Sequence, residues 1–176
     1  MKVGIFLERD GVLTTARTDR SPTSLAEFHV NQDAAPVLKK LKDAGFILIV
    51  TTNQPGLSQG TLPRRELDRM HDLLRRELPI DDLLLCPHEE SDQCPCRKPK
   101  PGLFQEARFK WQLDLERSFV VSDKWQDAVA ARACGCTSVL IESKWIGHVH
   151  RDFLVPDLAA AANKILQLHC IGTVTA

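Results

Sequence analysis

The sequence predicts an α/β fold in which a parallel β-sheet is covered by helices on both faces. Short apolar runs, typical of buried strands, alternate along the chain with segments whose apolar residues recur every three or four positions, typical of helices. Because each run is apolar throughout, both faces of each strand should be buried, as in parallel sheets with right-handed helical crossovers. With 176 residues the chain has the length of one domain, and we expect a single domain over residues 1–176.

Each apolar run is bounded by polar residues, glycine or proline, and therefore predicts one strand. In chain order, the five expected strands cover residues 3–7, 46–51, 83–86, 119–122 and 138–141.

The first helix is expected between Asp33, a suitable N-cap, and Gly45, which can adopt the left-handed conformation that ends a helix. The second begins at Pro63, which favours a first helical turn, and ends near Leu78. Three further helices are expected over residues 101–111, 126–134 and 157–168, the second of them ending at Gly135.

The charge balance excludes several classes of partner. The chain has 23 Lys and Arg against 23 Asp and Glu, so no net charge attracts nucleic acid or an anionic membrane. The apolar run 46–50 is far shorter than the roughly 20 residues that cross a bilayer. The apolar segment near the N-terminus is too short for a signal peptide, so we expect a cytoplasmic protein. In that compartment the six cysteines are expected to bind metal or pack in the core.

Polar residues follow three of the predicted strands, and the carboxyl ends of parallel strands meet at one edge of the sheet. Glu8 and Asp10 end the first strand, and they supply carboxylates for a nucleophile and a proton donor in phosphoryl transfer. For both carboxylates to reach the same site the chain must turn after the strand, and Gly11 permits such a turn. Asp123 completes a set of hard oxygen ligands, Glu8, Asp10 and Asp123, of the kind that Mg²⁺ prefers. Taken singly, each position is more typical of a solvated loop than of a site, and it is the occurrence at three strand ends that favours a site.

A second group of residues has the spacing of a zinc site. Cys86, His88, Cys94 and Cys96 offer three thiolates and one imidazole, which suits tetrahedral Zn²⁺ and leaves no position for a catalytic water. The alternatives are a disulfide of Cys94 or reduced thiols.

Four segments, 6–13, 50–56, 96–102 and 122–127, resemble in order the four motifs of the haloacid dehalogenase (HAD) superfamily. The similarity is strongest to its small-capped branch, which contains heptose bisphosphate phosphatases and histidinol-phosphate phosphatase domains. The resemblance implies a three-layer Rossmann-like fold with a minimal cap and a zinc-binding loop at 86–96. It also implies hydrolysis of a phosphomonoester, helped by Mg²⁺, through an acyl-phosphate intermediate.

Within this resemblance, Asp10 takes the place of the general acid and base and Asp123 that of a Mg²⁺ ligand. The stretch 14–28, which has no apolar periodicity, is expected to be a loop near the active site that gates or selects substrate. The residues expected to bind substrate are Thr52, Asn53, Gln54, Arg97, Lys98 and Lys124. The expected ligand is a small phosphorylated sugar or metabolite, and the sequence predicts no oligomeric state.

The sequence departs from the family at the nucleophile, where Glu8 stands in place of Asp. The extra methylene moves the carboxylate by roughly one ångström, which costs about 10²-fold in rate when a nucleophile is misplaced. Glu8 is therefore expected to lower or abolish turnover. The alternative is a protein without catalytic activity that binds metal and a phosphorylated ligand or regulates a partner.

Overall fold

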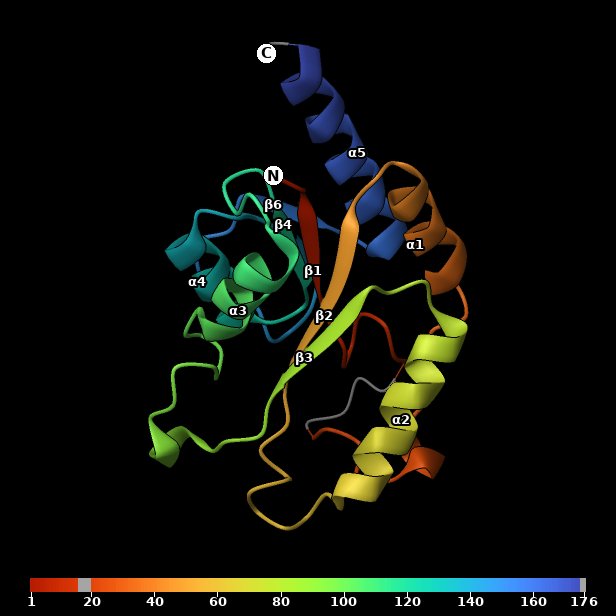
Figure 1. Ribbon diagram of the computed structural model, residues 1–176, viewed down its shortest axis with the longest axis vertical. Coiled ribbons are helices and arrows are strands. Elements are labelled where there is room, and N and C mark those ends of the chain that lie inside the picture. The colour runs from red at the N-terminus through yellow and green to blue at the C-terminus, as the bar shows by residue number, and fades with distance from the viewer. Residues whose placement is uncertain (16–19, 175–176) are drawn as a thin grey trace.

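The computed structural model describes residues 1–15 and 20–174, and it contains one six-stranded sheet in which all neighbouring strands are parallel. The strand order is β3-β2-β1-β4-β5-β6 (Figure 1). The strands are β1 Gly4–Glu8, β2 Ile47–Asn53, β3 Asp82–Cys86, β4 Phe119–Ser122, β5 Thr137–Ile141 and β6 Phe153–Val155. All five expected strands and the parallel α/β class are thus confirmed.

Helices cover both faces of the sheet, as Figure 1 shows. One face carries α1 (Ala34–Asp43), α5 (Leu158–Val174) and, towards its edge, α2 (Arg64–Glu77). The other face carries α3 (Gly102–Trp111) and α4 (Trp125–Cys134). The long connection between β3 and α3 extends away from these layers and holds three of the four predicted zinc-binding residues, whereas Cys86 ends β3.

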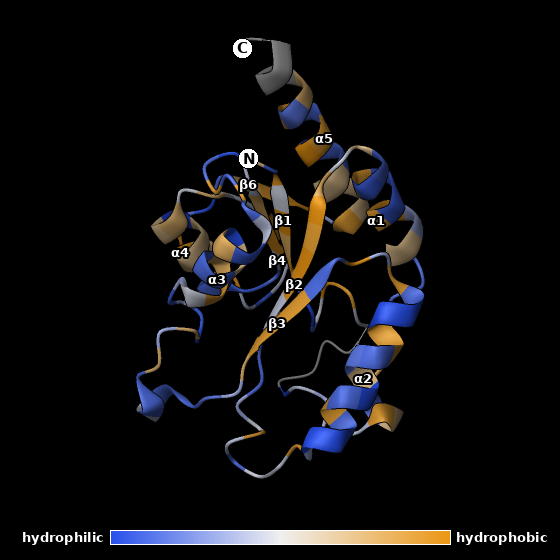
Figure 2. Ribbon diagram, viewed as in Figure 1, coloured by the Kyte–Doolittle hydropathy of each residue, from blue (hydrophilic) through white to orange (hydrophobic). Residues whose placement is uncertain are grey.

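The apolar strands explain the two-sided core, because successive side chains of a strand point to opposite faces. Ile5 and Leu7 pack in the cluster under α1 and α5, whereas Phe6 packs on the opposite side. There its ring stacks on Phe104 of α3, with 4.5 Å between the ring centroids. The strands are accordingly the most apolar part of the ribbon, whereas α2 turns a polar face outward (Figure 2).

Three details differ from the sequence-based expectation. The sheet has an additional edge strand, β6, which at 3 residues is too short to give a periodic signal. The α5 helix continues to Val174, beyond the expected end at residue 168. Asp33 makes no side-chain cap, and the Asn31 side chain instead accepts a hydrogen bond from the Asp33 N–H at 3.1 Å.

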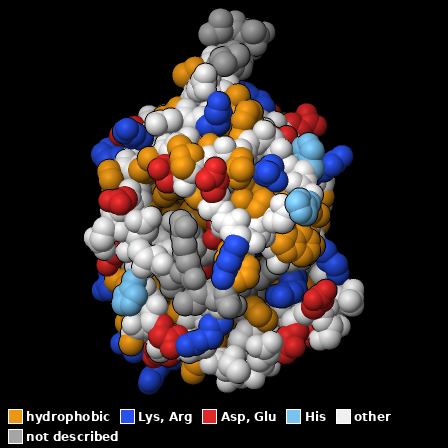
Figure 3. All heavy atoms as spheres, turned by 180° about the vertical axis from the view of Figure 1, so that it is seen from behind, with side chains coloured by type: hydrophobic (Ala, Val, Ile, Leu, Met, Phe, Trp, Pro, Cys, Tyr) orange, Lys and Arg blue, Asp and Glu red, His pale blue; other side chains and the backbone are white. Residues whose placement is uncertain are grey.

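The outer surface mixes charges of both signs, as expected from the balanced composition. On the face in Figure 3, Lys and Arg side chains lie interspersed with Asp and Glu. Within the described residues, none of the helices combines the length and the apolar character that crossing a bilayer requires.

The strand order fixes the position of the polar residues. β1 lies between β2 and β4. From β1 the chain adds β2 and β3 on one side of the sheet, and it then adds β4, β5 and β6 on the other side. In open parallel sheets, ligands bind outside the carboxyl ends of the strands at such a switch point. Glu8 is the last residue of β1 and therefore lies at this point.

Candidate active site

A sharp turn after β1 brings the two acidic residues of the first motif to the carboxyl edge of the sheet. Gly11 has a φ of +97°, a conformation that side-chain-bearing residues rarely adopt. A Cβ at this position would also collide with the carboxylate of Asp123, which follows β4. Glycine is therefore needed both for the turn and for the close approach of Asp123.

The Glu8 carboxylate is buried and makes hydrogen bonds through both of its oxygens. Oε1 accepts the backbone N–H groups of Arg9 at 2.8 Å and Asp10 at 3.3 Å, and Oε2 accepts the Lys98 ammonium at 2.6 Å. Burial raises the pKa of Glu8, but the charges of Lys124 and Lys98 outweigh burial and leave that pKa below its ordinary value. Glu8 is thus an anion in which three of the roughly four lone-pair sites of the carboxylate accept hydrogen bonds.

Lys98 joins the end of β1 to the start of α4. Its buried ammonium donates to Glu8, to the carbonyl of Thr51 at 3.0 Å and to Asp127 Oδ1 at 2.6 Å. Asn53 holds the backbone at this residue, accepting the Lys98 N–H at 3.1 Å and donating to its carbonyl at 3.0 Å. Burial raises the pKa of Asp127 to about 6, although Lys98 lowers it. Asp127 was not among the predicted site residues, yet it completes a buried pair of carboxylates around one lysine.

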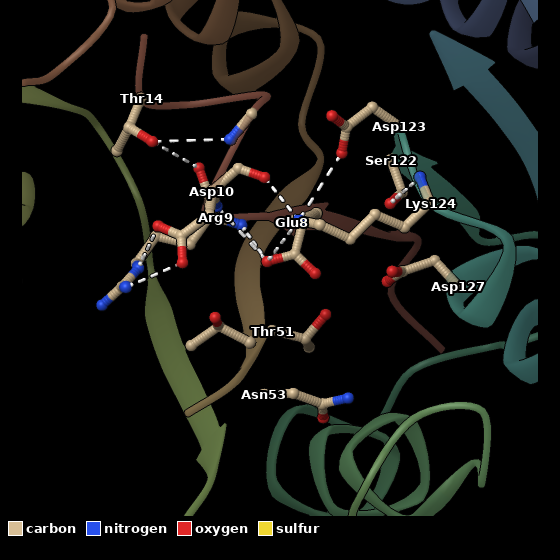
Figure 4. Close-up of polar contacts among 12 residues, drawn as sticks. Glu8, Arg9, Asp10, Thr14, Thr51, Asn53, Ser122, Asp123, Lys124 and Asp127 are labelled. Carbon is tan, nitrogen blue, oxygen red and sulfur yellow. Dashed lines mark hydrogen bonds and ion pairs between the residues drawn. The ribbon is translucent and has the colours of Figure 1, made fainter. Parts of the chain in front are cut away.

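The Lys124 ammonium lies among three oxygens that face a common point. It is 2.5 Å from the backbone carbonyl oxygen of Asp10, 3.6 Å from Asp123 Oδ1 and 3.8 Å from Glu8 Oε1 (Figure 4). Asp123 Oδ1 is buried without a hydrogen-bond partner. Burial raises the pKa of Asp123, with the nearby Glu8 charge acting in the same direction. Mg²⁺ prefers hard oxygen ligands, and the oxygens of Glu8, Asp123 and the Asp10 carbonyl that now surround the Lys124 ammonium could hold it.

The Asp10 carboxylate faces away from this point. The Arg9 guanidinium binds both of its oxygens at 2.8 Å, and Gln54 Nε2 donates to Oδ2 at 3.1 Å. Among the described residues, one group of at least three His, Cys, Asp or Glu has its ligand atoms within 4.8 Å of one another, and this cysteine cluster consists of Cys86, His88, Cys94 and Cys96. The Glu8, Asp10 and Asp123 carboxylates do not form such a group, and Asp10 faces Lys124 through its backbone carbonyl instead.

Arg9 is itself completely buried, although no function was predicted for it. Its guanidinium lies 5.2 Å from the centroid of the Phe28 ring and donates to His71 Nε2 at 3.1 Å. A buried Arg needs such partners, because an unpaired buried charge is strongly destabilising. The sequence does contain a signal for the burial of Arg9, because this residue lies between Glu8 and Asp10 in a segment that has apolar residues on both sides.

His71 gives a testable pH dependence of stability. Burial, together with the charges of Arg9 and Arg75, lowers the pKa of His71 to about 3. The unfolded chain, with a pKa near 6.5, takes up a proton first as pH falls, so stability decreases below about pH 6.5. Between pH 7 and pH 5 the expected loss from His71 is about 2 kcal/mol, measured by urea unfolding.

His71→Gln keeps an acceptor for Arg9 and does not titrate, so this part of the pH dependence should disappear. His148→Gln, at an exposed position, is the matched control and should keep it. If the free energy of unfolding of His71→Gln fell with pH as steeply as that of the wild-type chain, His71 would not be the cause of the pH dependence.

Glu8, Asp10, Lys98, Lys124 and Asp127 line a cavity of about 670 Å³. Of the predicted substrate-binding residues, Asn53, Gln54, Arg97, Lys98 and Lys124 line it. Thr52 does not, because its Oγ1 is buried and accepts a hydrogen bond from Gln54 at 2.8 Å.

The predicted substrate loop contributes residues 20–23 to the wall of this cavity. It also contains a short 3-10 helix, Leu25–Glu27. Residues 16–19 of the loop lie outside the described residues.

The predicted zinc ligands lie together, Cys86 at the end of β3 and the other three in the connection between β3 and α3. Cys86 Sγ is 3.6 Å from His88 Nδ1 and from Cys94 Sγ, and Cys96 Sγ is 3.3 Å from His88 Nδ1 and 3.5 Å from Cys94 Sγ. A tetrahedral site with Zn–S bonds near 2.3 Å has ligand atoms about 3.8 Å apart. All four residues are within reach of one ion, and the three cysteines are free thiols. The cluster could therefore hold Zn²⁺, directly before Arg97 and Lys98.

Comparison with known proteins yields consistent similarities. A family model described as HAD-hydrolase-like matches residues 95–161. The chain is 33% identical over 175 residues to the D-glycero-beta-D-manno-heptose-1,7-bisphosphate 7-phosphatase of Pseudomonas aeruginosa, covering 93% of this chain and 97% of that protein. It is 34% identical over 137 residues to the histidine biosynthesis bifunctional protein HisB of Campylobacter jejuni, covering 74% of this chain. That match spans only 39% of the length of HisB.

A solved structure extends the similarity to three dimensions. The chain superposes with a TM-score of 0.85 and 29% identity on D,D-heptose 1,7-bisphosphate phosphatase from Bordetella bronchiseptica, complexed with magnesium and phosphate. The superposition covers 96% of this chain and 99% of that one. The three-layer fold is therefore shared along almost the whole chain.

Proposed function

The chain belongs to the HAD-hydrolase-like family, and from that premise we propose that it hydrolyses a small phosphorylated sugar, similar to a heptose bisphosphate, with the help of Mg²⁺. The observation that carries the proposal is the meeting of Glu8, Lys98 and Lys124 on the floor of one open cavity. An anionic nucleophile with two ammonium groups beside it is what attack on a phosphate ester requires.

The reaction divides into two steps. An oxygen of Glu8 attacks phosphorus and forms an acyl phosphate, the bond from phosphorus to the sugar oxygen breaks, and Asp10 gives that oxygen a proton. Water then attacks the acyl phosphate, Asp10 takes a proton from it, and phosphate leaves with the Glu8 carboxylate restored. Lys98 and Lys124 offset the negative charge of the phosphoryl group in both steps.

The hydrogen bonds from Arg9 and Gln54 to the Asp10 carboxylate determine when Asp10 can transfer a proton. Burial raises the pKa of Asp10, but Arg9 outweighs it and leaves the pKa below its ordinary value. Asp10 is thus ready to accept a proton from water. To donate one, it must first be protonated, and an approaching phosphoryl dianion favours this by raising the pKa of Asp10.

Mg²⁺ would be held by the carboxylates of Glu8 and Asp123 and the carbonyl oxygen of Asp10, which now surround the Lys124 ammonium; Asp123 Oδ1 accepts no hydrogen bond there. When bound, this ion supplies positive charge to the phosphoryl oxygens. Zn²⁺ would be held by Cys86, His88, Cys94 and Cys96, and it would fix the loop that presents Arg97 and Lys98.

One observation favours a second function, in which the chain binds metal and a phosphorylated ligand without turning it over. Glu8 is longer than the Asp of the family, and its oxygens are engaged by two backbone N–H groups and Lys98. A nucleophile with engaged lone pairs is a poor one. The same cavity would then serve recognition alone.

A substrate panel separates the two functions. Phosphate release is measured with Mg²⁺ on heptose bisphosphate, histidinol phosphate and small sugar phosphates, for the wild-type chain and Asp10→Asn. We expect slow release from a sugar phosphate, lowered at least about 10²-fold in Asp10→Asn. Tight binding of a sugar phosphate without release supports the second function, and neither binding nor release would contradict both.

A further inference from the structure

The Glu8 carboxylate occupies a site that is built to bind an anion. The backbone N–H groups of Arg9 and Asp10 converge on Glu8 Oε1 at 2.8 and 3.3 Å. Successive backbone N–H groups that point to one spot form a concave anion-binding site in proteins. Here the anion that they bind is the side chain of the residue immediately before them.

A positive charge completes the same site. The Lys98 ammonium donates to Glu8 Oε2 at 2.6 Å, and both side chains are almost fully buried, with relative exposures of 1% and 4%. Two N–H groups and one ammonium are the donors that the oxygens of a phosphoryl group would need at this position. Glu8 therefore satisfies, within the chain itself, donors suited to an anionic ligand.

The length of the side chain makes this possible. Two methylene groups allow the Glu8 carboxylate to reach the N–H groups of the two residues that follow it in the chain. In Figure 4 the carboxylate lies below the backbone of Arg9 and Asp10, on the side from which Lys124 approaches. In this position Oε1 also lies 3.8 Å from the Lys124 ammonium.

We propose that Glu8 is a tethered occupant of the oxyanion site formed by the Arg9 and Asp10 N–H groups and Lys98, and that a phosphoryl group binds there only by displacing it. The proposal rests on the proposed function for its ligand, the tetrahedral oxyanion of a phosphomonoester. It assigns Glu8 a role as an internal competitor, in addition to that of nucleophile.

Inorganic phosphate is the probe that tests this, titrated calorimetrically in the absence of Mg²⁺. Glu8→Ala empties the site and should bind phosphate at least ten-fold more tightly than the wild-type chain. Asp127→Asn is the matched control, because Asp127 also lies 2.6 Å from the Lys98 ammonium but does not touch the two N–H groups. It removes the same charge and leaves the two N–H groups filled, so any gain in affinity should be at least three-fold smaller than that of Glu8→Ala. Equal gains in both variants would overturn the proposal, because the effect would then be one of net charge alone.

A measurement on the wild-type chain covers the case in which a variant does not fold. A scalar coupling across the hydrogen bond between the Arg9 amide nitrogen and the Glu8 side-chain carboxyl carbon should be detectable by NMR and disappear at saturating phosphate. A coupling that is absent, or that persists with phosphate bound, would contradict the proposal. Both experiments detect binding rather than turnover. A substrate panel without phosphate release would therefore reject the proposed hydrolysis while leaving this inference intact.

Discussion

Glu8→Asp is expected to raise the rate of phosphate release by about 10²-fold. The shorter side chain withdraws the carboxylate by roughly one ångström, which leaves the Arg9 and Asp10 N–H groups and Lys98 to the phosphoryl oxygens. It also places the nucleophile where the family has it. The measurement is kcat/KM with Mg²⁺ and the best sugar phosphate of the panel, for both proteins under identical conditions.

Glu8→Gln is the control for this comparison, because it keeps the length of the side chain and lacks a nucleophilic carboxylate. Its rate should fall to that of the uncatalysed reaction. Equal and substantial rates for the wild-type chain and Glu8→Asp would remove side-chain length as the limit on turnover. A Glu8→Asp protein that binds the sugar phosphate but releases no phosphate would favour the function without turnover.

The regular part of the fold could be predicted because its signals are local. Buried parallel strands such as β1 and β2 are continuous apolar runs, and Gly45 and Gly135, with φ of 90° and 75°, end helices as expected. The β6 strand is an edge strand of 3 residues, and it exists only because β5 offers it a partner. Such pairing depends on the strand that is already present in the sheet, so the sequence of three residues alone does not predict it.

The site was predictable to the extent that it depends on strand ends. The rule that ligands bind at the carboxyl edge of a parallel sheet brought Glu8 and Asp123 to the same region. The direction of each side chain does not follow from that rule. Arg9 turns the Asp10 carboxylate away, and Lys98 recruits Asp127, because buried charges must find partners in three dimensions.

Removing one ligand of the cysteine cluster is expected to have the second large effect, a loss of bound zinc and of local stability. Cys96→Ser removes one of four ligands, so the purified variant should lose the one equivalent of Zn²⁺ that we expect in the wild-type chain and that EDTA does not remove. Structural zinc contributes about 10–16 kcal/mol to folding in small peptides, and even a part of this would destabilise residues 86–101. Metal analysis combined with hydrogen exchange of the backbone amides in this segment measures both effects.

The consequence should reach the cavity, because Cys96 is followed directly by Arg97 and Lys98. Phosphate affinity should therefore fall in Cys96→Ser, whereas Cys134→Ser, outside the cluster, should keep the zinc, the exchange protection and the affinity. A wild-type chain that contains no zinc would contradict the metal site itself. If zinc is lost but the amides of residues 86–101 stay protected, the metal does not fix the loop, and the bonds from Asn53 to Lys98 suffice to hold it.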